Sequence, residues 1–128
     1  MIISWIAGGL LGLILLALSL MVSFRRRAAG ITLGDGGDAI LIARMRAQAN
    51  FVEYAPLTLL LLFLAEQTTS SRWLPAVAAA LLIAGRVLHP IGLGRPAFVT
   101  FRMLGMIGTW SALAMLSAWL LVAGIRLA

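Results

Sequence analysis

Long apolar runs alternate along the chain with short segments that hold most of the charged residues. Residues 2–24 and 103–125 are uncharged runs of 23 residues each. A helix of about 20 residues crosses a hydrocarbon core roughly 30 Å thick. Each run is therefore long enough to form a membrane-spanning helix, one near each end of the chain.

Two shorter apolar runs, residues 54–65 and 73–86, lie between them and continue into apolar sequence with a few polar residues. No internal repeat or second domain is visible. We therefore expect a single all-α membrane domain over residues 1–128, folded as a four-transmembrane-helix antiparallel bundle. Its predicted spans are about 2–24, 40–66, 73–93 and 102–125.

Composition excludes a soluble globular domain. The chain is 62% hydrophobic and 11% charged, with a mean hydropathy of +1.08, whereas soluble domains are about half apolar and a quarter charged. A net charge of +6 would suggest nucleic acid as the partner of a soluble protein. Here all ten basic residues are arginines between or at the ends of apolar runs. We interpret them as topology signals and as ligands for anions. We therefore expect the protein to lie in membrane lipid and not to bind nucleic acid.

The absence of cysteine limits the possible chemistry. Without a thiol, the protein has no disulfide, no thiolate metal site and no sulfur nucleophile of its own. A sulfur nucleophile must therefore arrive with a substrate.

The positions of the arginines predict the orientation. Arg25–Arg27 follow the first run, Arg95 and Arg102 lie around the third connection, and the short 67–72 connection carries one arginine. Because cytoplasmic loops carry an excess of basic residues, we expect the first and third loops in the cytoplasm and both termini outside it. A cleaved signal peptide is disfavoured, since the charges follow the first apolar run instead of preceding it.

The first loop has the sequence of a turn followed by a helix cap. Gly34-Asp35-Gly36-Gly37 is flexible and turn-forming, and Asp38 is well placed to cap the second helix. Two aspartates supply too few oxygen ligands for a calcium loop, so no metal site is expected.

The beginning of the second span is too polar to face lipid. Arg46, Asn50 and Glu53 are four and three residues apart and share one helix face, with Tyr54 one turn beyond Asn50. We call these four residues the polar stripe. One Arg or Asp at the bilayer centre costs about 2.5–3.5 kcal/mol on insertion scales. The polar stripe should therefore face protein or a polar cavity.

Other polar residues are expected at the same depth. The third span ends with Arg86 and His89, one turn apart, and the fourth begins near Arg102. Because neighbouring spans run antiparallel, these residues should meet the polar stripe at the cytoplasmic end. One interpretation is purely structural: Glu53 pairs with Arg46 or Arg86 and holds the helices together.

Charge counting favours a ligand in addition. This region has one carboxylate, Glu53, and five arginines: Arg44, Arg46, Arg86, Arg95 and Arg102. A buried surplus of positive charge needs an anionic partner. The rise from Arg46 to Glu53 is roughly 10 Å at about 1.5 Å per residue, close to the length of three extended residues. A small acidic peptide would fit along it.

The same residues form motifs that resemble those of the MAPEG family, the membrane-associated proteins of eicosanoid and glutathione metabolism. The motifs are Arg46-x-Gln48-x-Asn50-x-x-Glu53-Tyr54-x-Pro56, then Arg86-x-x-His89, then Arg102. Two further blocks, Gly34-Asp35-Gly36-Gly37 and Gly105-Met106-x-x-Thr109-Trp110, look like the small bacterial branch. The resemblance covers nearly the whole chain.

The resemblance implies a function. Family members are homotrimers of four-helix subunits that bind glutathione between neighbouring subunits at the cytoplasmic side. By position, the polar stripe matches residues that hold the glutathione peptide, and Arg86 and His89 match third-helix positions that line the same pocket. Arg102 matches the arginine proposed to stabilise the glutathione thiolate, which makes it the candidate catalytic residue.

We therefore expect a glutathione transferase or peroxidase in a bacterial inner membrane, acting as a homotrimer on lipophilic electrophiles. Two positions depart from the pattern: Leu93 stands where the eicosanoid enzymes carry a second pocket tyrosine, and Gln48 where bacterial relatives often have histidine. The alternatives are a non-catalytic module that binds glutathione or lipid headgroups and a small four-helix transporter. Transporters of that type use a membrane-embedded glutamate in the first span, and residues 2–24 carry no charge.

Overall fold

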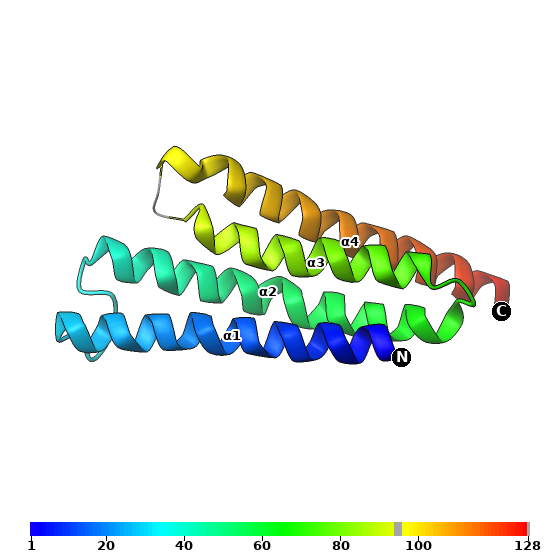
Figure 1. The fold of residues 1–128 in the computed structure, drawn as a ribbon, viewed down its shortest axis with the longest axis horizontal. Helices are drawn as coiled ribbons and strands as arrows, with labels where there is room; N and C mark the ends of the chain where they lie inside the picture. Colours follow the sequence, from blue (N-terminus) through cyan, green and yellow to red (C-terminus); the bar gives the residue numbers. More distant parts are fainter. Residues whose placement is uncertain (94–95, 128) are drawn as a thin grey trace.

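The computed structural model describes residues 1–93 and 96–127 and contains four long helices (Figure 1). They are α1 (Ile2–Ala29), α2 (Ala39–Thr68), α3 (Trp73–Ile91) and α4 (Val99–Leu127), with a 3-10 turn, η1 (Pro96–Phe98), before α4. All four are long and apolar enough to cross a membrane. The predicted all-α, four-helix fold class is confirmed.

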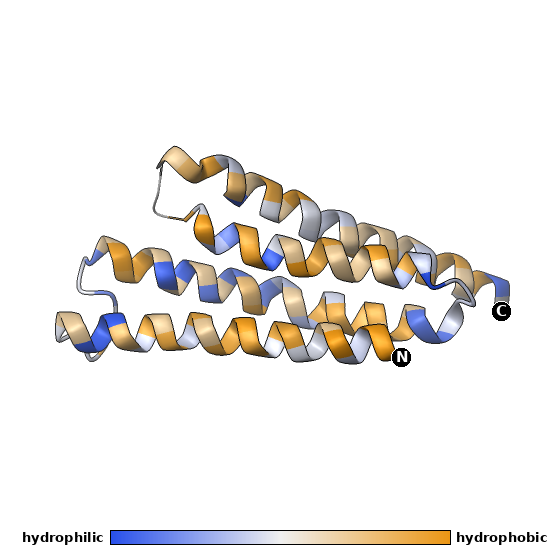
Figure 2. Ribbon diagram, in the orientation of Figure 1, coloured by the Kyte–Doolittle hydropathy of each residue, from blue (hydrophilic) through white to orange (hydrophobic). Residues whose placement is uncertain are grey.

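The helices run antiparallel along one long axis (Figure 1). The first loop, the start of α2 and the end of α3 lie at one end, which we call the loop-1 end. The start of α1 and the connection between α2 and α3 lie at the opposite end. Apolar residues cover much of every helix (Figure 2), and many large ones are exposed, such as Leu13 and Ile107. An exposed apolar belt of this kind suits a lipid solvent.

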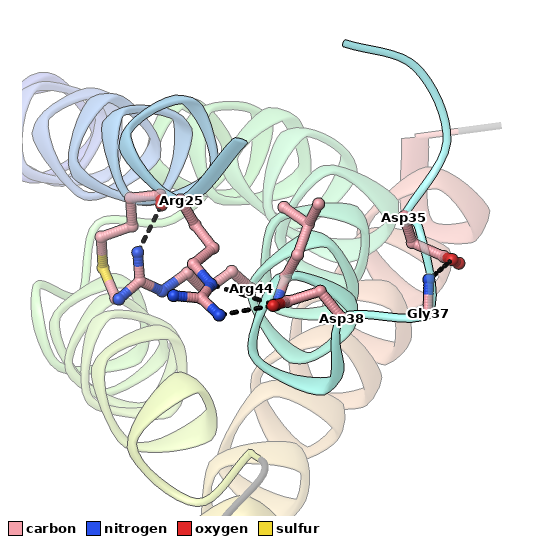
Figure 3. Close-up of polar contacts among 7 residues, drawn as sticks. Arg25, Asp35, Gly37, Asp38 and Arg44 are labelled. Carbon is pink, nitrogen blue, oxygen red and sulfur yellow. Dashed lines mark hydrogen bonds and ion pairs between the residues drawn. The ribbon is translucent and has the colours of Figure 1, made fainter. Parts of the chain in front are cut away.

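The junction between α1 and α2 is fixed by local hydrogen bonds. Gly30 ends α1 in the left-handed conformation, with φ of 67°, which glycine adopts without a Cβ clash. Asp38 precedes the first residue of α2 and accepts a hydrogen bond from the Leu41 amide at 2.6 Å, which confirms the predicted cap. Its carboxylate also forms an ion pair with Arg25 (Figure 3). The Arg25 guanidinium and the Leu41 amide lower the pKa of Asp38 to about 2.

Alanine and leucine make up most of the buried core. One buried cluster includes Leu18, Ala47 and Phe51. A second, nearer the opposite end, includes Leu62 and Ala78. In lipid, helices associate through close van der Waals packing and not through a gain in hydrophobic burial, so alanine and glycine serve well at their contacts.

The closest helix contact joins α3 to α4. A Cβ on Gly85 would lie 2.6 Å from the Gly105 carbonyl oxygen, and one on Gly105 would lie 2.6 Å from the His89 amide nitrogen. The first span also contains glycines, which in principle permit close helix contact. Among the described residues, however, a Cβ added to Gly9 or Gly12 would meet no atom within 4 Å. The backbones approach each other at α3 and α4 instead.

The end opposite loop 1 is held by Glu66, which the sequence did not single out. Its carboxylate accepts hydrogen bonds from the backbone amides of Ile3 at 3.1 Å and Ser4 at 2.9 Å, and from the Ser4 hydroxyl. It also pairs with the Met1 amino group at 2.5 Å. These are the free amides of the first turn of α1, where a negative charge is favourable.

Candidate functional site

Arg86 lies at the centre of a group of polar side chains contributed by α2, α3 and α4. Its side chain is buried, with 1% of the residue exposed. Nη1 donates to Oδ1 of Asn50 at 2.8 Å and to the Asn50 carbonyl oxygen at 3.2 Å. Nη2 donates to Oγ1 of Thr109 at 2.6 Å. One guanidinium therefore links α3 to both α2 and α4.

The Arg86 charge has polar and aromatic partners. Its guanidinium carbon lies 5.8 Å from the centre of the Tyr54 ring, a favourable cation–π distance, and Nη2 also contacts the Met106 sulfur at 3.7 Å. Its Nε is the one buried side-chain nitrogen or oxygen without a hydrogen-bond partner among the described residues. Both terminal nitrogens of the Arg86 guanidinium therefore form hydrogen bonds within the chain, and Nε does not.

Glu53 does not form an ion pair with Arg86. Across residues 1–93 and 96–127, the ion pairs are those of Met1 with Glu66 and Arg25 with Asp38. Glu53 is exposed. Among the described residues, no ion pair of Glu53 with Arg46 or Arg86 is therefore formed.

The polar stripe lies at the border between core and surface. One side of α2 packs into the core through buried residues at every fourth position, namely Ala47, Phe51 and Ala55. Asn50 and Tyr54 are half-buried at its edge, next to Arg86. The other two stripe residues, Arg46 and Glu53, are exposed.

His89 and Arg102 lie near the loop-1 end, on α3 and α4. His89 is buried, with 5% exposed, and its backbone packs against Gly105. Arg102 is exposed in the first turn of α4. A Cβ on Gly92 would lie 2.5 Å from the Arg102 amide nitrogen, so the start of α4 packs tightly against the end of α3. Arg95 lies outside the described residues.

The structure places six of the seven predicted site residues in two groups. Asn50, Tyr54 and Arg86 are brought together by direct contacts, whereas Arg46, Glu53 and Arg102 are exposed. The seventh, His89, is buried on α3 outside both groups.

The sequence did not identify Thr109 as the partner of Arg86. The Thr109 hydroxyl accepts from Arg86 and donates to the Gly105 carbonyl oxygen at 2.9 Å, and the residue is 0% exposed. A hydroxyl in an apolar span, one turn after a glycine, is the signal that marks it. That signal shows a polar contact but not the partner, because Arg86 is 23 residues away in the sequence.

Comparison with known proteins agrees with these motifs. A sequence model of the MAPEG family matches residues 4–122. The chain belongs to the MAPEG family. It is also similar to the inner membrane protein YecN of Escherichia coli K12, with 32% identity over 104 residues, which cover 81% of this chain and 79% of YecN. The protein of the same name from Escherichia coli O6:H1 gives the same values.

In this MAPEG protein, the exposed side chain of Glu53 lies halfway along a membrane-spanning helix. Glu53 is the fifteenth of the 30 residues of α2, halfway along the helix. At about 1.5 Å per residue, it lies roughly 20 Å from either end. A charge at that depth in contact with lipid is costly. Contact with polar groups would be more favourable for Glu53 than contact with lipid.

Proposed function

We propose that the protein is a homotrimeric glutathione transferase of a bacterial inner membrane, acting on lipophilic electrophiles, with peroxidase activity toward lipophilic peroxides as a variant of the same chemistry. The observation that carries the proposal is the pair of exposed charges, Arg46 and Glu53, on the membrane-spanning part of α2. A neighbouring subunit and a zwitterionic peptide together would cover and satisfy both charges.

Glutathione has the complementary groups: two carboxylates, one ammonium and a thiol. Arg46 would bind a carboxylate through its planar fork, and Glu53 would bind the ammonium. The two residues are seven positions apart, a rise of roughly 10 Å, which matches an extended tripeptide. The peptide therefore fits the polar stripe in both charge and length.

The buried Arg86 would act on this peptide through Asn50. Because Arg86 donates to Oδ1 of Asn50 at 2.8 Å, the amide group of Asn50 is held with its NH₂ free to donate elsewhere. The ring of Tyr54 is held by the same guanidinium. Arg86 is thus a positioning residue for two members of the polar stripe. His89, one turn further along α3, would line the same glutathione pocket.

Arg102 would activate the thiol. A cysteine thiol has a pKa near 8.5, and a neighbouring guanidinium favours the reactive thiolate. Lowering that pKa by about one to two units takes roughly 1.4–2.7 kcal/mol, within reach of one well-placed arginine. The thiolate sulfur then bonds to an electrophilic carbon, the leaving group departs with the bonding electrons, and the thiol proton passes to water.

The trimer would follow from the same surface. One four-helix subunit leaves Arg46, Glu53 and Arg102 exposed, whereas a closed ring of copies encloses these faces between neighbours. The lipophilic substrate would enter from the bilayer. In the orientation that the arginines predict, this site faces the cytoplasm, where glutathione is available.

Two measurements on the detergent-solubilised protein test the proposal. Calorimetric titration with glutathione should show saturable binding, and turnover of a chloronitrobenzene should depend on glutathione and on the protein. Binding without turnover would favour the non-catalytic module. The position of Leu93 supports that alternative, because this half-buried residue packs against the apolar core and offers no hydroxyl to a thiol. Absence of binding would reject both.

A further inference from the structure

An apolar cavity at the loop-1 end lies apart from the polar stripe. It has a volume of about 590 Å³ and is formed by α1, α2 and the end of α3. Its walls include Leu18 and Met21 of α1, Ala43 and Ala47 of α2, and Leu93 beyond α3. This volume is typical of cavities that hold a small ligand.

Small residues and diverging helices create the cavity. Ala43 and Ala47 occupy successive turns of α2 on the face that lines it, and their methyl groups fill little of the space toward α3. The pair α3 and α4 also diverges from the pair α1 and α2 toward the loop-1 end (Figure 1). The opening is thus a consequence of the sequence of α2 and of the helix directions.

Arg44 is the one charged side chain among the described residues that line this cavity. Its Nη1 donates to the Met21 carbonyl oxygen at 2.7 Å, which leaves the other donors of its guanidinium available. The nearby Asp38 is already paired with Arg25 (Figure 3). Across the described part of the chain, Arg44 therefore has no carboxylate partner.

Arg44 does not belong to the polar stripe. It lies two residues before Arg46, and two residues turn an α-helix by about 200°, so the two side chains leave α2 on nearly opposite sides. Arg44 is also only the sixth residue of α2, about 8 Å from the helix start. That depth is close to the boundary between hydrocarbon and headgroups, where long basic side chains reach lipid phosphates.

We propose that this cavity binds an anionic phospholipid of the surrounding bilayer, with one acyl chain against the apolar walls and the phosphate paired with Arg44. The apolar lining suits a hydrocarbon chain, and the single unpaired guanidinium selects a negative headgroup. None of the four polar-stripe residues lines this cavity, which shares only Leu93 with the positions compared with the family's pocket. The lipid proposal therefore does not require that the protein bind glutathione.

Native mass spectrometry of the full chain in mild detergent tests the site. Phosphatidylglycerol and phosphatidylcholine with identical acyl chains are the two probes. The parent should retain at least about fivefold more phosphatidylglycerol, a difference of about 1 kcal/mol. Arg44→Gln should abolish that preference and Arg44→Lys should keep most of it. The matched control Arg72→Gln, an exposed arginine at the opposite end, should leave it unchanged.

Ala43→Leu tests the acyl-chain part independently of charge, because it fills the cavity and should lower the retention of both lipids. Equal retention of the two lipids by the parent, or an unchanged preference in Arg44→Gln, would overturn the proposal. Displacement of phosphatidylglycerol by equimolar palmitate would also overturn it, by assigning the cavity to a single-chain acid. A change in oligomer mass without loss of lipid in Ala43→Leu would overturn it too, by assigning the cavity to a second copy of the chain.

Discussion

Arg86 donates to Oδ1 of Asn50 at 2.8 Å across the interface between α3 and α2. Through this bond, the buried guanidinium of Arg86 holds the half-buried side-chain amide of Asn50, a member of the polar stripe. The same guanidinium reaches Thr109 on α4, so three helices meet at one side chain. Changes at these contacts should alter both the stability of the bundle and the orientation of the site.

Thr109→Val should destabilise the protein because it removes the acceptor of Arg86 Nη2 while keeping the shape of the side chain. Leaving a buried charged donor without its partner costs about 1–3 kcal/mol or more. Thermal unfolding in detergent measures the change. Ser111→Ala, at an exposed position on the same helix, is the control and should unfold like the parent; equal effects of the two variants would contradict the role of Thr109.

Gly105→Ala should separate α3 from α4. The added Cβ would lie 2.6 Å from the His89 amide nitrogen and 2.8 Å from the Gly85 carbonyl oxygen, both backbone atoms that cannot rotate away. Overpacking of this kind costs about 1–3 kcal/mol. Gly124→Ala, which meets nothing within 4 Å, should be tolerated. A parent-like unfolding temperature for Gly105→Ala would contradict the backbone contact.

Protonation of Asp38 should weaken the junction between α1 and α2. The Arg25 guanidinium and the Leu41 amide lower the pKa of Asp38 from 3.8 to about 2. Its stabilisation is therefore fully present above pH 3.8 and is lost as the pH falls through about 2. Unfolding followed by circular dichroism from pH 5 to 2 should show a larger loss of stability in the parent and in Asp35→Asn than in Asp38→Asn, which keeps only the loss due to other carboxylates such as Glu66. A parent profile identical to that of Asp38→Asn would contradict it.

Glu53→Gln and Arg46→Ala should each weaken the binding of glutathione, because each removes the partner of one charged group on the peptide. Loss of one member of a desolvated charged pair costs about 2–5 kcal/mol, so titration should show at least about a 30-fold rise in Kd. Circular dichroism checks that the variants are folded. If both fold and bind like the parent, the polar stripe contributes to packing alone.

The general architecture could be predicted from the chain, because lipid imposes strong rules on it. Two long uncharged runs and two shorter apolar runs predict the four helices, and Asp38 at the end of a glycine-rich turn predicts the cap of α2. The spacing of Arg46, Asn50 and Glu53 placed polar groups along one helix face. These features depend on local sequence and on the cost of exposing polar groups to lipid.

Tertiary partners could not be predicted in the same way. Thr109 and Glu66 owe their roles to residues 23 and 62 positions away, and nothing in the local sequence specifies such a partner. Likewise, glycine is compatible with close packing in both α1 and α3, but only the crossing of α3 with α4 makes Gly85 necessary. The sequence predicts on which face of its helix a residue lies, but it does not predict which other helix that face contacts.

The most direct test of the proposed chemistry is the thiolate absorbance of bound glutathione, measured across a pH series in the parent and in Arg102→Ala. The parent should show thiolate below the ordinary thiol pKa of about 8.5. Arg102→Ala should bind glutathione within a few fold of the parent, since other groups hold the peptide, but should lose that signal and most turnover of a chloronitrobenzene. Arg126→Ala, at the opposite end of α4, is the matched control and should behave like the parent. A thiolate signal that persists in Arg102→Ala, or that never forms in the parent, would contradict the proposed role of Arg102.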